Sequence, residues 1–331
     1  MISNPGQAFQ GFFTIITGGL TLNFQKGVGQ IFYFATPIIC TGLAIGFANK
    51  TGLFNIGASG QFIIGAYAAV VVGIRLSSLG QVHWVVALIA SGIAGGLWAL
   101  IPGVLKAFFN VNEVIAAIMM NYIGMYTVNF LVKGDKVIFD SLRNQSSPVA
   151  STANIPKMGL DQIFQGSSVN GGFIIAVVIA IVVHIILNKT TFGYELKAVG
   201  LNRDASKYAG INEKKSIVLS MVISGLLAGI GGGLLYLAGT GKHIEVVDIL
   251  ADEGFTGISI ALLGLNHPLG ILASAIFIAY VTVGGFYLQM YDYSTEIIDI
   301  IIAVIIYFSA FALIVKSFLQ KRKAKKERGE K

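Results

Sequence analysis

Side chains that could do chemistry are few in this sequence, and they fall into two groups. Amides and hydroxyls interrupt otherwise apolar stretches, and one charged segment, TTFGYELKAVGLNRDASKYAGINEKKS (190–216), separates two stretches with almost no charge. An amide buried without a partner costs about 1–3 kcal/mol, so amides at membrane depth either line a polar path or join helices. Six polar residues are candidates for lining such a polar path through the protein, and a structural role is the alternative for each. They are Asn55, Ser59, Gln61, Asn121, Thr256 and Ser259.

Motifs for enzymatic chemistry are missing from the sequence. No GxxxxGK[ST] phosphate loop occurs, so we do not expect the chain to bind ATP itself. The four histidines are scattered, and none is paired with Cys or Glu at metal-binding spacing. The run GIGGG (229–233) lies in an apolar stretch and indicates close helix packing rather than phosphate binding. The sequence therefore predicts no catalytic residue, no metal and no cofactor in this chain.

The composition places the polar groups in a membrane protein. Of the 331 residues, 55% are hydrophobic and 12% are charged, whereas a soluble domain is about one-quarter charged. Within lipid, backbone groups must bond internally, so apolar stretches of about 20 residues are expected to be helices. We predict an all-α, polytopic protein with interrupted helices and about nine crossings, at 29–48, 57–74, 82–102, 111–132, 171–188, 216–239, 248–264, 268–284 and 295–319.

The count of nine depends on the apolar stretch 248–284, which is too long for a single crossing. Pro268 disfavours helix at His267 and divides this stretch into two short crossings. Around the transmembrane domain (28–319), we predict an N-terminal interfacial segment (1–27) and a basic tail (320–331). Within that domain, 189–215 is the predicted cytoplasmic coupling region and 133–170 the longest extracytoplasmic loop.

The distribution of basic residues predicts the orientation. With the segment 189–215 in the cytoplasm, 16 of the 23 Lys and Arg residues lie on the cytoplasmic side, as the positive-inside rule requires. This arrangement places the C terminus inside and the N terminus outside. The net charge of +7 then reflects topology and contact with the lipid bilayer rather than binding to nucleic acid.

The charged segment carries the signals of two short helices. Gly200 is expected to end the first helix (191–199) in a left-handed conformation. Asn202 can cap the second helix (203–209), and Gly210 can end it. A plain solvated loop does not need two caps, although a loop that only maintains topology is the alternative. We interpret the segment as a rigid docking element for a cytoplasmic partner.

The same segment resembles the coupling-helix region of ABC-importer permeases of the ribose and branched-chain amino acid type. The shared residues, in order, are F-G (192–193), A-V-G (198–200), N (202), A (205) and A-G-I (209–211). Three further stretches are similar to the nucleoside-importing branch: TGLFNIGASGQFIIGAYAA (51–69), VNEVIAAIMMNYI (111–123) and GFTGISIALLGLNHPLGILASAIF (254–277). The resemblance covers roughly 30–310. Relatives usually carry one more span upstream, so a truncated or shorter variant is expected here.

The resemblance implies a permease subunit of an ATP-driven importer in the bacterial cell membrane, which takes up nucleosides by alternating access. The implied partners are ATPase subunits that bind ATP and Mg, a second homologous permease in a heterodimer, and an extracytoplasmic solute-binding lipoprotein. The implied coupling residues are Gly200, Asn202, Arg203, Asp204, Ala205, Tyr208, Ala209 and Gly210. The alternatives are a permease for a simple sugar and an ion-coupled secondary transporter. The latter would need carboxylates at membrane depth, which are nearly absent midspan.

Overall fold

The computed structural model describes residues 13–15, 17, 23–287, 300–305 and 307–308. Seven helices in this part are long and apolar enough to cross a membrane. They are α2 (Phe24–Lys50), α3 (Ala58–Arg75), α4 (His83–Phe109, preceded by the 3-10 helix η1, Ser77–Val82), α5 (Glu113–Gly134), α7 (Gly172–Lys189), α10 (Glu213–Tyr236) and α12 (Pro268–Phe286). The chain is therefore a multi-pass membrane protein of the all-α class, as its composition predicts.

Helices α2 and α10 form the centre of the bundle and are the most buried of these seven helices. Helix α10 packs against α4, α3 and α2, and α2 also contacts α11 (Asp252–Leu263), α12 and α7. Small residues allow this close approach: at Gly95 of α4 and at Gly225 and Gly229 of α10, an added Cβ would collide with atoms of the facing helix. The prediction that GIGGG serves helix packing is confirmed.

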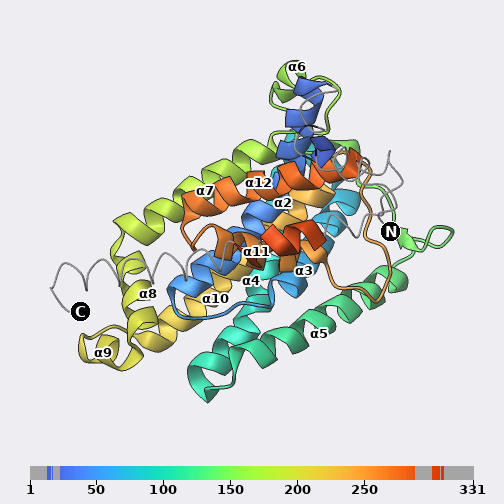
Figure 1. Cartoon of the computed structure of the whole chain (residues 1–331). Helices are drawn as coiled ribbons and strands as arrows, with labels where there is room; N and C mark the ends of the chain where they lie inside the picture. Colours follow the sequence, from blue (N-terminus) through green and yellow to red (C-terminus); the bar gives the residue numbers. More distant parts are fainter. Residues whose placement is uncertain (1–12, 16, 18–22, 288–299, 306, 309–331) are drawn as a thin grey trace.

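Short elements mark the two ends of the bundle (Figure 1). One end carries α8 (Thr191–Leu201) and α9 (Arg203–Tyr208), and we call it the coupling end. The opposite end carries the loop after α5, which contains the antiparallel strands β1 (Phe139–Asp140) and β2 (Gln145–Ser146), the 3-10 helix η2 (Ser151–Ala153) and α6 (Leu160–Ile163). The strands add little to an otherwise helical fold.

The expected crossing at 248–264 is wrong. Residues 237–251 are not helical, and α11 has only 12 residues, which is about 18 Å of helix and too short for a bilayer core of about 30 Å. The chain enters the bundle from the opposite end without helical structure, held there by the Ser146 N–H, which donates to the Ile244 carbonyl (2.8 Å). A helix, α11, is needed only for the part of the membrane depth that remains between this non-helical segment and the coupling end.

The observed bounds of another helix differ from those of the predicted crossing, and one predicted crossing lies largely outside the residues that the structure describes. Helix α4 passes through Pro102 and continues to Phe109, although 82–102 was the predicted span. The expected crossing at 295–319 falls mostly outside the described residues, as do most of 1–27 and all of 320–331. The count of nine crossings is therefore not confirmed.

Candidate functional site

The charged segment forms the two predicted helices, each with a capping side chain. Thr190 Oγ1 accepts a hydrogen bond from the Gly193 N–H (3.1 Å) at the start of α8. Asn202 Oδ1 accepts from the Ala205 N–H (3.0 Å) at the start of α9. Gly210 has φ +81°, the left-handed conformation expected at the end of a helix. The predictions for Asn202 and Gly210 as helix signals are confirmed.

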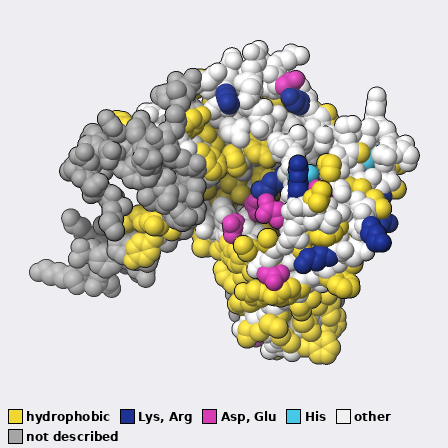
Figure 2. Space-filling model, turned by 90° about the vertical axis from the view of Figure 1, so that its right-hand side faces the viewer, with side chains coloured by type: hydrophobic (Ala, Val, Ile, Leu, Met, Phe, Trp, Pro, Cys, Tyr) yellow, Lys and Arg dark blue, Asp and Glu magenta, His cyan; other side chains and the backbone are white. Residues whose placement is uncertain are grey.

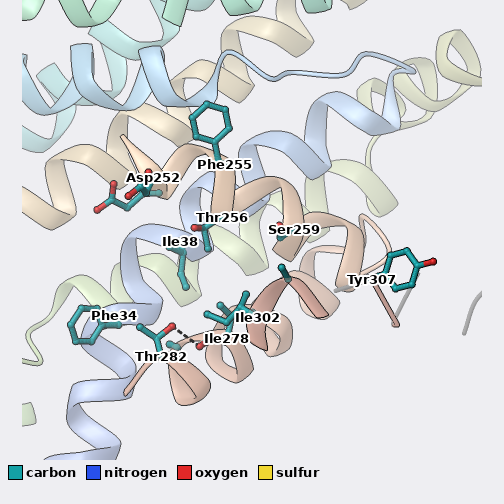
Figure 3. A pocket seen from close by; sticks show the side chains of 13 residues that line it. Phe34, Ile38, Asp252, Phe255, Thr256, Ser259, Ile278, Thr282, Ile302 and Tyr307 are labelled. Atoms are coloured by element: carbon teal, nitrogen blue, oxygen red, sulfur yellow. Dashed lines mark hydrogen bonds between the residues drawn. The ribbon is translucent and has the colours of Figure 1, made fainter. Parts of the chain in front are cut away.

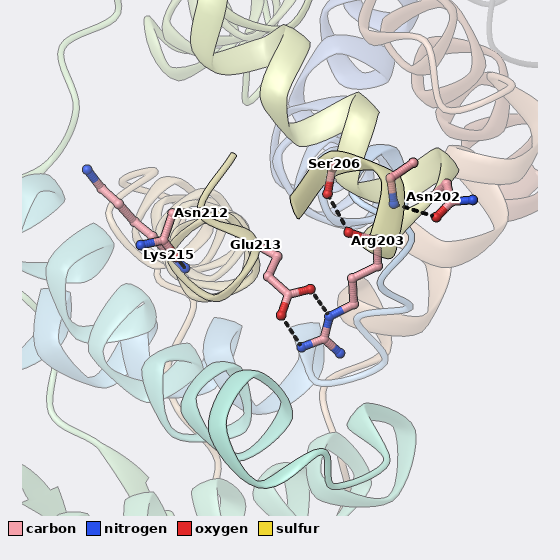
Figure 4. A network of polar contacts seen from close by, with 7 residues as sticks. Asn202, Arg203, Ser206, Asn212, Glu213 and Lys215 are labelled. Carbon is pink, nitrogen blue, oxygen red and sulfur yellow. Dashed lines mark hydrogen bonds and ion pairs between the residues drawn. The ribbon is translucent and has the colours of Figure 1, made fainter. Parts of the chain in front are cut away.

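An ion pair closes α9 onto the start of α10 (Figure 4). The Arg203 guanidinium donates to both carboxylate oxygens of Glu213, at 2.6 Å from Nε and 3.5 Å from Nη2. Asn212 Oδ1 accepts from the Lys215 N–H (3.1 Å) and caps α10. Both connections at the ends of α9 are thereby fixed by side chains, so the unit is rigid rather than a loose loop.

The outer surface of this unit is exposed in the part of the chain that the structure describes. Tyr208 is 95% exposed and Leu201 90% exposed, while Asp204, Ala205 and Ala209 are also exposed. Beside them lies a recess of about 520 Å³, which is lined by α8, α9 and Ile211. Large apolar side chains that point away from their own fold are typical of a surface that binds a partner.

The left-handed helix end predicted at Gly200 is wrong. Helix α8 continues to Leu201, so Gly200 is helical and has no positive φ. Instead, its Cα lies against the backbone where α2 ends: an added Cβ would be 2.5 Å from the Lys50 carbonyl oxygen and 2.9 Å from the Gly52 nitrogen. Gly200 thus joins the coupling helices to α2 by direct backbone contact.

The chain beyond this contact turns back into the bundle without helical structure, over residues 51–57, before α3 begins at Ala58. This matches the predicted interrupted helix. Thr51 and Ser220 share a hydroxyl–hydroxyl hydrogen bond (2.8 Å). Asn55 Nδ2 donates to Ser224 Oγ (2.7 Å) and to Gln61 Oε1 (2.8 Å). We call this re-entrant segment with its partners the buried joint; it ties the start of α3 to α10.

Two further helices meet the buried joint where α3 begins. Asn121 of α5 accepts from the Gly60 N–H (2.8 Å) and donates to the Ile56 carbonyl (3.0 Å). Ser59 Oγ donates to the Ala251 carbonyl (2.8 Å), directly before α11. Both side chains are about 1% exposed. The start of α3 therefore contacts both α5 and the residue directly before α11.

The predicted path residues separate into two sets. Asn55, Ser59, Gln61 and Asn121 are buried and hydrogen-bonded within the protein. This geometry fits the structural alternative for these four, and their assignment to a path stays a prediction.

Thr256 and Ser259 instead line a cavity of about 650 Å³ between α2, α11, α12 and the residues Ile302, Ala303 and Tyr307. Figure 3 shows its walls, which include Phe34 and Ile38 from α2, Ile278 and Thr282 from α12, and Tyr307.

Charged side chains gather near this cavity at the opposite end of the bundle. Asp252 and Glu253 line the cavity, and Glu253 also borders a second one, of about 440 Å³, together with Lys242. Figure 2, which looks onto the opposite end, shows acidic and basic side chains around a recess, above a broad apolar surface. Among the described residues, no cluster of His, Cys, Asp and Glu could hold a metal ion.

Sequence reasoning missed the hydroxyls of α10 that complete the buried joint. Ser216, Ser220 and Ser224 are all buried, and two of them bond to the re-entrant segment. Their spacing of four residues places them on one helix face. That periodic row of serines in an apolar span was a signal that could have identified them.

Comparison with known proteins agrees with this architecture. Residues 27–310 match the family model described as branched-chain amino acid transport system / permease component. The guanosine ABC transporter permease protein NupP of Bacillus subtilis (strain 168) is 38% identical over 317 residues, which cover 94% of this chain and 90% of NupP.

Two other relatives are more distant. The glucose ABC transporter permease protein TsgB13 of Haloferax volcanii is 29% identical over 294 residues (87% of this chain, 77% of TsgB13). The guanosine ABC transporter permease protein NupQ of B. subtilis is 29% identical over 255 residues (75% of this chain, 77% of NupQ).

No solved structure matches the chain. The relatives are named as permease components, which are transport subunits, and the ATPase activity of such a system lies in partner subunits. The match over residues 27–310 and the similarity to NupP along nearly its whole length lead to one conclusion. The chain belongs to the family of branched-chain amino acid transport system permease components.

Proposed function

We propose that the chain is the nucleoside-translocating permease subunit of an ABC importer. The observation that carries the mechanism is the unbroken contact from the coupling helices to the starts of α3 and α11. The name of NupP, the guanosine permease that is 38% identical to the chain, supports the substrate class. A simple sugar is the second candidate, because TsgB13 is named a glucose permease.

The contacts suggest how movement at α8 and α9 changes the transmembrane helices. A displaced α8 carries the Lys50–Gly52 backbone with it, since Gly200 leaves no gap between them. Asn55 then pulls on Gln61 at the start of α3, and Thr51 and Asn55 also pull on Ser220 and Ser224 of α10. The start of α3 is in turn bonded to Asn121 of α5 and to the residue before α11. Helices with two discrete arrangements can transmit such a displacement through packed contacts. Alternating access follows when α5 and α11 shift together.

The proposed partners follow from the same assignment. ATPase subunits, which bind ATP and Mg, dock on the coupling end through Asn202–Gly210 and the exposed Tyr208. This chain binds no cofactor of its own. The similarity of the chain to both NupP and NupQ supports a second, homologous permease. A solute-binding lipoprotein delivers the nucleoside at the opposite end, in an orientation that leaves the C terminus in the cytoplasm of a bacterial cell.

One experiment tests the proposal directly. The permease is co-expressed with its ATPase and second permease, reconstituted together with the solute-binding lipoprotein, and assayed for uptake of labelled guanosine and labelled glucose with and without ATP. We expect ATP-dependent guanosine uptake. Ala209→Arg should abolish uptake and ATPase retention on the affinity column, while Lys157→Ala, at the opposite end, should change neither. Uptake without any ATPase would support the secondary transporter, and glucose uptake alone would support the sugar importer.

A further inference from the structure

Helix α5 uses only one of its sides within the described protein. It packs chiefly against α3 and α4, and it lies along the margin of the bundle in Figure 1. Its buried side holds Asn121 and Met125, whereas Tyr122 and Tyr126 are 48% and 54% exposed. Met119 and Phe130 extend the same free face by one turn in each direction.

The two tyrosines lie near the middle of the membrane. Tyr122 follows the first residue of α5, Glu113, by about 13 Å of helix and precedes the last, Gly134, by about 18 Å. In the part of the chain that the structure describes, neither phenol hydroxyl has a hydrogen-bond partner. Tyrosine normally occurs at the membrane interface, where the hydroxyl reaches water, so this depth is costly for a side chain that faces lipid.

The exposed faces of α4 and α7 lack such groups. Helix α4 exposes Ile89, Ile93 and Leu97, and α7 exposes Val178 and Ile181. These aliphatic side chains suit lipid tails. The contrast indicates that the free face of α5 is covered by something that can pair with hydroxyl groups.

Direct packing of another helix fits this face poorly. Helices in membranes approach one another through small residues, and the small residues of α5 lie on its buried side. Gly124, for example, faces Trp98 and Gly60, and Ala117 is fully buried. The free face carries Ile, Met, Tyr, Phe and Leu instead.

We propose that Tyr122 and Tyr126 line the translocation path and form the contact surface for the nucleoside in transit. The inference rests on the proposed function. The two rings, one helical turn apart, offer faces for a purine or pyrimidine ring. Their hydroxyls can donate to and accept from the ribose hydroxyls. Asn121 is less available, since its amide is already bonded to Gly60 of α3 and to the Ile56 carbonyl. A weak contact of this kind lets the solute pass without trapping it.

Cysteine labelling tests the proposal in the assembled transporter. Cys40 is the only cysteine and is fully buried, so the native chain provides an unreactive background. Tyr122→Cys and Tyr126→Cys are treated with a water-soluble thiosulfonate, next to Leu97→Cys and Val178→Cys on the aliphatic faces. Because only the hydrated thiolate reacts, we expect the two α5 positions to label on the order of tenfold faster than the controls. Guanosine, but not glucose, should slow this labelling.

Two results would overturn the proposal. If the α5 cysteines are labelled no faster than Leu97→Cys, lipid or protein covers the free face of α5. If guanosine does not slow their labelling, the face contacts water but does not bind the substrate.

Uptake by the conservative variants adds a second readout. Tyr122→Phe keeps the ring and should raise the KM for guanosine a few-fold, and Tyr122→Leu should raise it further. If the unmutated complex fails to import any nucleoside, the proposed function and this inference both fail; if it imports but the cysteines behave as the controls, only this inference does.

Discussion

The buried joint and the cavity beside α11 contain the same kinds of side chain and differ in what those side chains contact. In the buried joint, Asn55 and Asn121 are fully enclosed, and their amide groups bond to other parts of the protein. In the cavity, Thr256 and Ser259 face open space. Polar residues at membrane depth therefore lie in two kinds of environment in this fold: one set fixes helices to one another, and the other set lines a cavity.

The largest effect is expected where the coupling helices touch α2. Gly200→Val inserts a branched side chain where even a Cβ would lie 2.5 Å from the Lys50 carbonyl oxygen. Overpacking of this kind costs about 1–3 kcal/mol, and here it also separates α8 from the buried joint. We expect loss of ATP-dependent uptake and a lower unfolding temperature in detergent. Gly134→Val is the matched control, because nothing lies within 4 Å of a Cβ there; equal behaviour of the two variants would contradict the proposed contact.

A second test removes one amide from the buried joint. Asn55→Ala leaves Ser224, Gln61 and the Gly57 N–H without the partner they have now. Each unsatisfied buried group costs about 1–3 kcal/mol. We expect ATP hydrolysis to continue while uptake falls at least tenfold, measured on the same reconstituted complex. Thr256→Val, in the cavity wall, should change uptake with little effect on thermal stability. A larger loss of thermal stability in Thr256→Val than in Asn55→Ala would contradict the difference between the cavity and the buried joint.

The ion pair between Arg203 and Glu213 should matter less. Both side chains are partly exposed, at 35% and 16%, and exposed pairs contribute about 0–1 kcal/mol. Arg203→Ala is expected to lower stability slightly and to weaken the stimulation of ATPase activity by substrate two- to threefold. Lys157→Ala, at the opposite end and with no ion pair among the described residues, is the control. An unchanged stimulation in Arg203→Ala would show that α9 is held by its caps alone.

The smallest effect is predicted at the opposite end, where the pKa of Asp135 is lowered. The Val137 N–H donates to its carboxylate, and the Arg75 guanidinium forms an ion pair with it. A carboxyl whose pKa is lower in the folded protein stabilises the fold above its unfolded pKa, near 3.8, and loses this contribution as the pH falls through the folded pKa. We expect faster amide hydrogen exchange at Val137 and Ile138 on acidification, relative to the intrinsic rate, and a smaller change in Arg75→Gln. Equal pH dependence in both proteins would rule out the ion pair as a cause.

Helix caps were predictable because they depend on near neighbours in the chain. Asn112 and Asn202 each bond to an amide two or three residues ahead, and Gly210 alone determines its own φ. Residues that contact distant segments were not predictable in this way. Gly200 looks like a helix terminator beside Asn202, but its conformation is set by Lys50–Gly52, about 150 residues earlier.

The sequence by itself determined the membrane class, the long helices and the two capped coupling helices, since hydrophobic length and local hydrogen bonding specify them without reference to the rest of the chain. Only the tertiary structure decided that α11 is too short to cross the bilayer, that Asn55 and Asn121 join helices, and that Tyr122 and Tyr126 are exposed. Those outcomes depend on which segments meet at the same depth in the membrane. That depth is fixed by packing between residues far apart in sequence, which no local pattern encodes.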